Sequence, residues 1–277
     1  MDERQKKIAV INDLSGYGRC SLTVALPILS ALKLQCCPVP TSILSNHTGY
    51  PTYYFDDYTE RMTPYIEGWK SLNLDFDGIL TGFLGSERQI AIVMDFIARF
   101  KCAGTSLIVD PIMGDHGKAY ATYTPRMCEA MGELAAMADV LTPNLTEACI
   151  LTGVQYRETG WEKAQLEELL NQVMELGPDK VVITGIKQGG YLANLLGIRG
   201  ERPVWIRTKK VGCERPGTGD VFSSIVAADA VLGKPLEASV RTASKFIQAC
   251  ILESERRQVP VQDGVCFEYL LNRLIRH

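Results

Sequence analysis

The sequence predicts an α/β protein, a three-layer α/β/α sandwich in which helices cover both faces of a mostly parallel central sheet and a hairpin closes one edge. Three observations lead to this prediction. Short β-rich apolar runs alternate with longer amphipathic stretches, as strands and helices do in parallel sheets. Polar residues follow every predicted parallel strand. No repeat, low-complexity tract or flexible linker interrupts the 277 residues, so we expect a single domain over residues 1–277.

Short apolar runs are predicted as the strands of the parallel part of the sheet. The first, residues 7–12, ends at polar and glycine residues, as a buried strand does. Similar runs follow at residues 38–44, 78–81, 106–110, 139–142 and 180–184. Two more, residues 191–196 and 203–209, are separated by Gly197 and Gly200 and predict the edge hairpin.

Helices are predicted between these strands from their amphipathic pattern. They cover residues 21–32, 86–100, 125–137 and 161–176, and helices at residues 218–232, 236–254 and 265–275 close the chain. Pro27 should kink the first helix or mark a later start, because proline lacks the N–H that a helix interior requires.

Composition excludes several classes of protein. A net charge of −3 and a pI of about 5.7 argue against a dedicated nucleic-acid binder, which needs a positive field. The three histidines, of which His277 is the last residue, nearly exclude a histidine-rich metal site. No apolar stretch approaches the roughly 20 residues that span a bilayer, and the charged start is unlike a signal peptide. With nine scattered cysteines, we expect reduced thiols in a cytoplasmic protein without membrane partners.

The polar residues that follow the strands predict a ligand site. In open parallel sheets, ligands bind outside the carboxyl ends of the strands. The residues found there are 12–13, 45–47, 81–82, 110–111, 142–144 and 184–185. This pattern indicates an enzyme, or a binder of a polar ligand.

The glycine-rich segment after the first strand matches neither of two common nucleotide-binding motifs. The chain has no GxxxxGK[ST] motif, which argues against a Walker-type site. Residues 16–21, GYGRCS, come close to the dinucleotide fingerprint. That fingerprint also needs an acidic residue to hold the ribose, and none occurs between Asp13 and Asp56. We therefore interpret these glycines as a tight turn with a close backbone approach.

The strongest single motif is Gly217-Thr218-Gly219-Asp220, directly before an apolar helix. The glycines free the backbone N–H groups to converge, and the helix adds its positive end, so together they form an anion hole. The same residues could simply cap the helix. A carboxylate beside an anion hole makes sense if a hydroxyl group that attacks phosphorus lies between them. The helix end should lower the pKa of Asp220.

Four motifs in order resemble one family. Residues 217–220 resemble the GTGD segment of the ribokinase-like small-molecule kinases. Residues 110–115 (DPIMGD) and 142–147 (TPNLTE) are similar to segments of its vitamin-kinase branch. Residues 45–50 (SNHTGY) resemble pyridoxal kinases in particular. The likeness extends from Ile8 to about Ile251 and is closest to the bacterial vitamin B6 kinases.

The resemblance implies transfer of the ATP γ-phosphoryl group to the 5′-hydroxymethyl group of pyridoxal, pyridoxine or pyridoxamine, with Mg²⁺, in a homodimer. Asp220 matches the catalytic base, and Gly217, Thr218 and Gly219 match the anion hole. The matching nucleotide-side residues are Asn144, Glu147, Thr184 and Asp115, and the acidic set for magnesium is Asp110, Asp115 and Glu147. A monovalent cation near Asp110 and Thr142 is suggested by analogy alone.

On the substrate side, the resemblance assigns His47 and Thr48. From the residues themselves, Asp13 could bind a ring nitrogen or hydroxyl, and Tyr17 and Phe83 could form apolar walls for a flat ring.

Two departures keep alternatives open. Asp13 stands where animal pyridoxal kinases usually carry serine and resembles the hydroxymethylpyrimidine kinases, and Phe83 stands where tyrosine is usual. A hydroxymethylpyrimidine kinase or a dual-specificity kinase therefore remains an alternative. A sugar kinase and a non-catalytic nucleotide-binding module are further alternatives.

Overall fold

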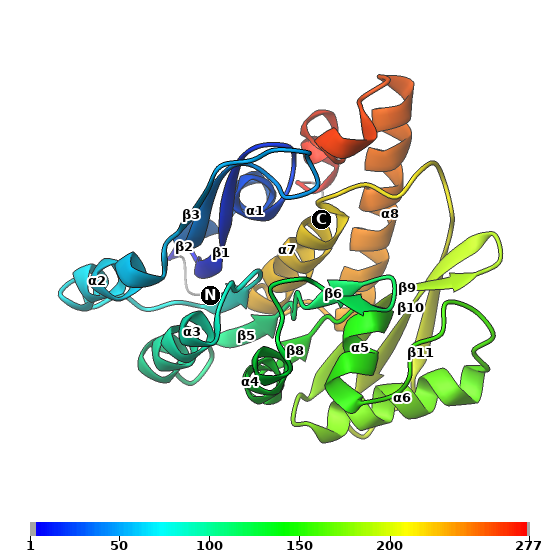
Figure 1. Ribbon diagram of the computed structural model, residues 1–277, viewed down its shortest axis with the longest axis horizontal. Coiled ribbons are helices and arrows are strands. Elements are labelled where there is room, and N and C mark those ends of the chain that lie inside the picture. Colours follow the sequence, from blue (N-terminus) through cyan, green and yellow to red (C-terminus); the bar gives the residue numbers. More distant parts are fainter. Residues whose placement is uncertain (1–3, 276–277) are drawn as a thin grey trace.

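The computed structural model describes residues 4–275, which form one nine-stranded sheet between two layers of helices (Figure 1). The strand order is β11-β10-β9-β8-β5-β4-β1-β2-β3. The six central strands from β9 to β2 are parallel, whereas β10, β11 and β3 pair antiparallel at the two edges. The predicted fold class and the edge hairpin β10–β11 are confirmed.

Each predicted run overlaps one strand, although β1, β2 and β9 extend beyond the predicted bounds. In sheet order they are β11 (Val204–Lys209), β10 (Tyr191–Ile198), β9 (Lys180–Gln188), β8 (Val140–Leu141), β5 (Ser106–Val109), β4 (Gly78–Thr81), β1 (Lys7–Tyr17), β2 (Gln35–Asn46) and β3 (Phe55–Asp57). A separate small hairpin consists of β6 (Gly114–Asp115) and β7 (Lys118–Ala119).

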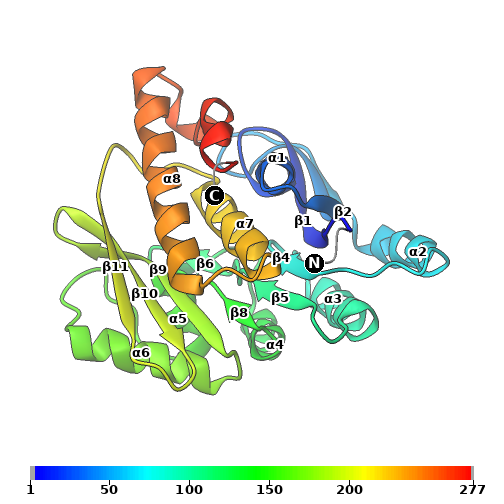
Figure 2. The ribbon, with the colours of Figure 1, turned by 180° about the vertical axis from the view of Figure 1, so that it is seen from behind.

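Alternation along the strands creates the two cores. In β1, Ala9 and Ile11 face one side of the sheet, while Ile8 and Val10 face the other, and all four side chains are fully buried. The first face packs against α2 (Thr59–Lys70), α3 (Glu87–Phe100), α4 (Pro125–Ala136), α5 (Leu145–Thr152) and α6 (Lys163–Glu175). The second packs against α1 (Ser21–Ala31), α7 (Thr218–Val231) and α8 (Leu236–Arg256), which Figure 2 shows in front of the sheet.

Four details differ from the sequence prediction. Strand β1 does not end at residue 12 but continues to Tyr17, with a break in its register against β2 between Asn12 and Leu14. Helix α1 runs from Ser21 through Pro27, because its apolar face is buried on both sides of the proline. The helix expected at residues 265–275 is wrong, since the chain forms only a short 3-10 helix there, η2 (Glu268–Arg273), which follows another, η1 (Val261–Asp263). The sequence prediction also lacked α2 and β3.

Two further properties concern the whole described chain. Within residues 4–275, no helix is long and apolar enough to cross a membrane. The nine cysteines are all unpaired in this structure.

Candidate active site

The amino end of α7 is held in place by its flanking loop. Gly217 has a φ of 78°, and a Cβ atom there would lie 2.0 Å from the carbonyl oxygen of Arg19, so only glycine fits. The buried guanidinium of Arg215 donates to three carbonyl oxygens of the C-terminal segment, those of Val259 and Pro260 at 3.0 Å and that of Gly264 at 3.3 Å. The first N–H groups of a helix have no partner inside the helix, so this end can receive an anion.

Asp220 lies in the first turn of α7 and is half-buried. Burial raises the pKa of its carboxyl group to about 6, and the negative charge of Asp13 adds to this effect. Hydrogen bonds from the Ser21 backbone N–H and the Asn12 amide oppose the rise without cancelling it. The expectation that the helix end lowers the pKa of Asp220 is therefore wrong, because desolvation outweighs the favourable contacts. A carboxyl group with this pKa is ionised at neutral pH and is a stronger base than an ordinary aspartate.

Asn12 is a site residue that the sequence did not single out. Its Nδ2 donates to Oδ1 of Asp220 at 3.3 Å, while its Oδ1 accepts the backbone N–H groups of Asp13 and Phe83, both at 2.9 Å. It is 5% exposed, and a Cβ atom at Gly82 would lie 2.5 Å from its amide carbon. Its place at a strand end was the only signal in the sequence.

Asp13 lies at the register break of β1 rather than at the end of the strand. Ser15 donates to one of its carboxylate oxygens at 2.9 Å and Ser21 donates to the other at 2.5 Å. Burial raises the pKa of Asp13 despite these two bonds. Ser21 has a φ of 53°, a strained value for a residue other than glycine, which lets it contact both aspartates. The structure thus brings the carboxyl groups of Asp13 and Asp220 together around the start of α1.

Asp110 follows β5 and belongs to the same electrostatic group. Burial and the negative charge of Asp220 raise the pKa of Asp110 to about 7, while the hydroxyls of Ser223 and Thr142 oppose this shift. The carboxyl groups of Asp110 and Asp220 therefore repel each other, and a cation bound at Asp110 would relieve this repulsion.

Asn144 and Glu147 form a capping box at the start of α5. Asn144 Oδ1 accepts the Glu147 N–H at 2.9 Å, and Glu147 Oε2 accepts the Asn144 N–H at 2.7 Å. The other oxygen of Glu147 accepts the backbone N–H of Met113 at 3.2 Å. Glu147 is 4% exposed, and burial together with the charge of Asp110 raises its pKa well above the ordinary value. Asn144 Nδ2 also donates to the Gly114 carbonyl at 2.8 Å and so ties the β6–β7 hairpin to α5.

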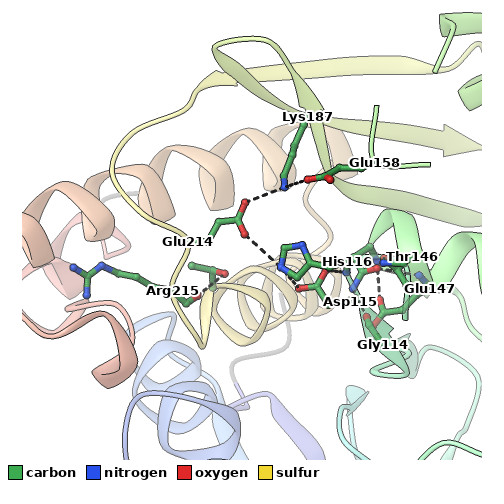
Figure 3. A network of polar contacts seen from close by, with 12 residues as sticks. Gly114, Asp115, His116, Thr146, Glu147, Glu158, Lys187, Glu214 and Arg215 are labelled. Carbon is green, nitrogen blue, oxygen red and sulfur yellow. Dashed lines mark hydrogen bonds and ion pairs between the residues drawn. The ribbon is translucent and has the colours of Figure 1, made fainter. Parts of the chain in front are cut away.

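Asp115 and Thr184 both lie close to this capping box, since Asn144 bonds to Gly114 and forms a bridge with Thr184. Thr184 of β9 donates its N–H to the Pro143 carbonyl at 2.8 Å. Asp115 precedes a two-residue turn in which His116 and Gly117 both have positive φ, 50° and 78°, as a type I′ hairpin requires. Figure 3 shows Asp115 and His116 pointing toward Glu214, the residue that precedes the loop leading to α7.

The residues predicted for the substrate side contact the C-terminal segment. His47 Nδ1 accepts the Gly49 N–H at 3.1 Å, so its Nε2 donates to the Gln262 carbonyl at 2.7 Å. The Tyr17 and Tyr50 hydroxyls donate to the two carboxylate oxygens of Asp263, at 3.1 and 2.7 Å.

The other two predicted substrate residues differ in exposure. Thr48 is exposed in the same loop as His47. Phe83 is half-buried beside Asn12. Gly18 has a φ of 86°, and a Cβ atom there would lie 2.6 Å from the His47 ring. The backbone of this glycine turn therefore packs closely against His47, as the sequence predicted for a close approach.

The three carboxylates predicted for magnesium do not form one ligand set. Among the residues that the structure describes, no group of three or more His, Cys, Asp or Glu side chains could hold a metal ion. Both oxygens of Glu147 accept backbone N–H groups. Asp110, with its uncompensated repulsion from Asp220, is the carboxyl group that fits a divalent cation, which usually takes few protein ligands when phosphates supply the others.

Comparisons with known proteins agree on one family. A family model described as phosphomethylpyrimidine kinase matches residues 32–264. The pyridoxine/pyridoxal/pyridoxamine kinase of Bordetella avium is 31% identical over 247 residues, covering 83% of this chain and 79% of that protein. A candidate phosphomethylpyrimidine kinase of Bacteroides thetaiotaomicron, crystallised with pyridoxal, has a TM-score of 0.90 at 37% identity, covering 98% of this chain and 96% of that one. The pyridoxal kinase of Leishmania donovani with ADP and pyridoxamine has a TM-score of 0.88 at 25% identity, with coverages of 98% and 96%.

Proposed function

Because this chain belongs to the phosphomethylpyrimidine kinase family, we propose that it transfers the γ-phosphoryl group of ATP to the 5′-hydroxymethyl group of pyridoxal, pyridoxine or pyridoxamine. The observation that carries this proposal is the position of Asp220. Its carboxyl group, with a pKa of about 6, lies in the first turn of α7, next to the backbone N–H groups of the GTGD loop. A base and an anion hole at one helix end suit an alcohol that attacks phosphorus.

The proposed chemistry depends on two functions of this helix end. The N–H groups around Gly217, Thr218 and Gly219 stabilise the negative charge on the phosphoryl group as it moves. Asp220 accepts the proton of the attacking hydroxyl, and Asn12 holds the carboxylate in place through its hydrogen bond of 3.3 Å.

The nucleotide phosphates are assigned to the opposite side of Asp220. Asn144, Glu147, Asp115 and Thr184 lie around the start of α5 and the middle of β9, close to the β6–β7 hairpin. We assign Asp110 as the residue that would hold magnesium together with the phosphates. When bound, magnesium would neutralise phosphate charge and relieve the repulsion between Asp110 and Asp220.

The vitamin ring is assigned to the side formed by β1 and the loop after β2. His47 and Thr48 belong to this loop, Tyr17 ends β1, and Asp13 and Phe83 lie beside Asn12. Asp13 already accepts two hydroxyl groups, so we assign it a role in positioning the substrate side rather than free recognition of the ring.

A hydroxymethylpyrimidine kinase, or a kinase for both rings, is the second candidate function. The family description names a pyrimidine substrate, and Asp13 is the residue of this chain that resembles that branch. The mechanism is unchanged, since only the ring that carries the hydroxymethyl group differs. We also propose a homodimer with a cytoplasmic location; sedimentation of the purified protein tests the dimer, and fractionation of cells tests the location.

The experiment is ATP consumption measured in parallel with pyridoxal, pyridoxine, pyridoxamine and hydroxymethylpyrimidine, with ribose as the sugar control. We expect turnover with at least one B6 vitamer. Turnover with ribose alone, or with none of the five, contradicts the proposal, and turnover with the pyrimidine alone selects the second candidate.

The role of Asp220 is tested by Asp220→Asn. A positioned general base contributes roughly 10²–10⁴-fold, so we expect at least a hundredfold loss of kcat. The affinity for ADP, measured by calorimetry, should change little because the variant keeps the helix end. Undiminished turnover removes Asp220 from the role of base.

A further inference from the structure

A chain of charged side chains crosses the face of the site between β9 and α7 (Figure 3). Lys187 Nζ lies 3.3 Å from Glu158 Oε1 and 3.6 Å from Glu214 Oε1. The other oxygen of Glu214 lies 3.6 Å from His116 Nε2, which in turn lies 3.6 Å from Asp115 Oδ2. Glu214 also lies 3.9 Å from Lys210 Nζ, so it connects three basic side chains.

Three members of this chain belong to segments that carry residues of the proposed site. Lys187 follows Thr184 on the same strand, β9. Glu214 directly precedes Arg215, which anchors the loop that leads to the helix end of α7. His116 is next to Asp115 in the β6–β7 turn. The cluster therefore lies at the mouth of the proposed phosphate site.

The contacts in this cluster are weak enough to exchange. The separations of 3.6 Å from Glu214 are longer than hydrogen bonds, and the side chains of Lys187, Glu214 and His116 are 32%, 50% and 60% exposed. Exposed ion pairs of this kind add little stability. The phosphate tail of a nucleotide carries several negative charges, and a lysine ammonium binds phosphate as a point charge.

We propose, on the basis of the proposed function, that Lys187 binds a phosphate of the nucleotide and that Glu158 and Glu214 hold its ammonium group until the nucleotide arrives. Glu214 is then an internal competitor for Lys187. It lowers the affinity for the nucleotide but keeps the ammonium group at the mouth of the site when no phosphate is bound.

The test is calorimetric binding of ADP with Mg²⁺ to the full-length protein and three variants. Lys187→Met should weaken binding by about fivefold or more, as the loss of one charged phosphate contact implies. Glu214→Gln should tighten binding by about two- to fivefold, because it removes one of the two carboxylates that compete for Lys187. In the double variant, most of this gain should disappear, since the Lys187 ammonium group is absent and only that of Lys210, 3.9 Å from Glu214, is released.

Glu201→Gln is the matched control, because it removes the same charge from an exposed side chain in the distant β10–β11 turn and should leave ADP affinity unchanged. Thermal unfolding identifies any variant that does not fold, and Lys187→Gln then replaces Lys187→Met. The inference is overturned if the Lys187 variants bind ADP like the wild type, or if the full gain from Glu214→Gln persists without Lys187. If the wild-type protein binds no ADP, the proposed function is overturned together with this inference. If the wild type binds ADP and only the variants behave differently from expectation, the inference alone is overturned.

Discussion

Removal of the Asn12 amide should shift the pH dependence of the enzyme, because this group donates to the base. The carboxylate form of Asp220 is the form that accepts a proton. Its pKa is about 6, so kcat/KM should fall as the pH decreases through 6. Asn12→Ala removes the donor at 3.3 Å that favours the carboxylate. The acid limb of the variant should therefore move to higher pH.

The size of the shift follows from the strength of this hydrogen bond. Bonds to charged groups contribute about 1.5–3 kcal/mol, and a length of 3.3 Å puts this one at the weak end. One pKa unit corresponds to about 1.4 kcal/mol, so the limb should move by about one unit, to roughly 7. At pH 6 about half of the wild-type sites carry the carboxylate, against roughly a tenth in the variant. We expect a deficit of about fivefold at pH 6 that largely disappears at pH 8.

The assay is ADP release from pH 5 to pH 8.5, with pyridoxal well below its KM so that the free enzyme is observed. Asp110 also titrates, with a pKa of about 7. The comparison of Asn12 with Asn12→Ala is therefore repeated in proteins that carry Asp110→Asn. Asn12→Ala also removes the acceptor for two backbone N–H groups and should lower the Tm, but the pH profile is independent of this loss. A variant that is slower by the same factor at every pH refutes the assignment of Asn12, and a wild type without an acid limb refutes that of Asp220.

Two further substitutions test the loops around the site. Gly217→Ala should lower the Tm by about 3–5 °C, since a Cβ atom 2.0 Å from the Arg19 carbonyl and a φ of 78° together cost about 2–3 kcal/mol. Gly219→Ala, where nothing lies within 4 Å, is the control and should keep its Tm. Tyr50→Phe should raise the KM for pyridoxal several-fold, because the loop loses its hydrogen bond of 2.7 Å to Asp263. The KM for ATP should stay unchanged, and an equal rise in both values contradicts this role.

The sequence predicted the order of strands and helices and the position of Asp220 well, because both depend on local signals. Apolar runs of the right length mark the strands, and two glycines before an apolar run mark the start of the helix that carries Asp220. The last helix was predicted because apolar residues in 265–275 recur at helical spacing, but no α-helix forms there. In the structure, Leu270 and Leu274 reach the second core from short 3-10 turns.

The pKa of Asp220 and the role of Asn12 could not be predicted in this way. Asn12 belongs to β1, and only the packing of β1 and α1 against the start of α7 brings it to Asp220, 208 residues later in the chain. The same packing removes water from the carboxyl group, which reverses the pKa shift that the helix end alone suggests. The polar run from Asn12 to Ser15 also resembles a loop, although it continues the strand with a break in register.

The structure therefore divides the proposed chemistry between two elements. The start of α7 offers N–H groups to a phosphoryl group, and a helix end of this kind favours negative charge, which by itself would make Asp220 a weak base. Strand β1 counteracts this effect, because its packing against the start of α7 excludes water from the carboxyl group and places the negative charge of Asp13 nearby. These two effects outweigh the hydrogen bond from Asn12, which favours the carboxylate. The anion hole can then remain strongly attractive for phosphate while the base keeps a proton affinity suited to neutral pH. Neither element could supply both properties, since the same positive helix end that binds the anion also weakens the base.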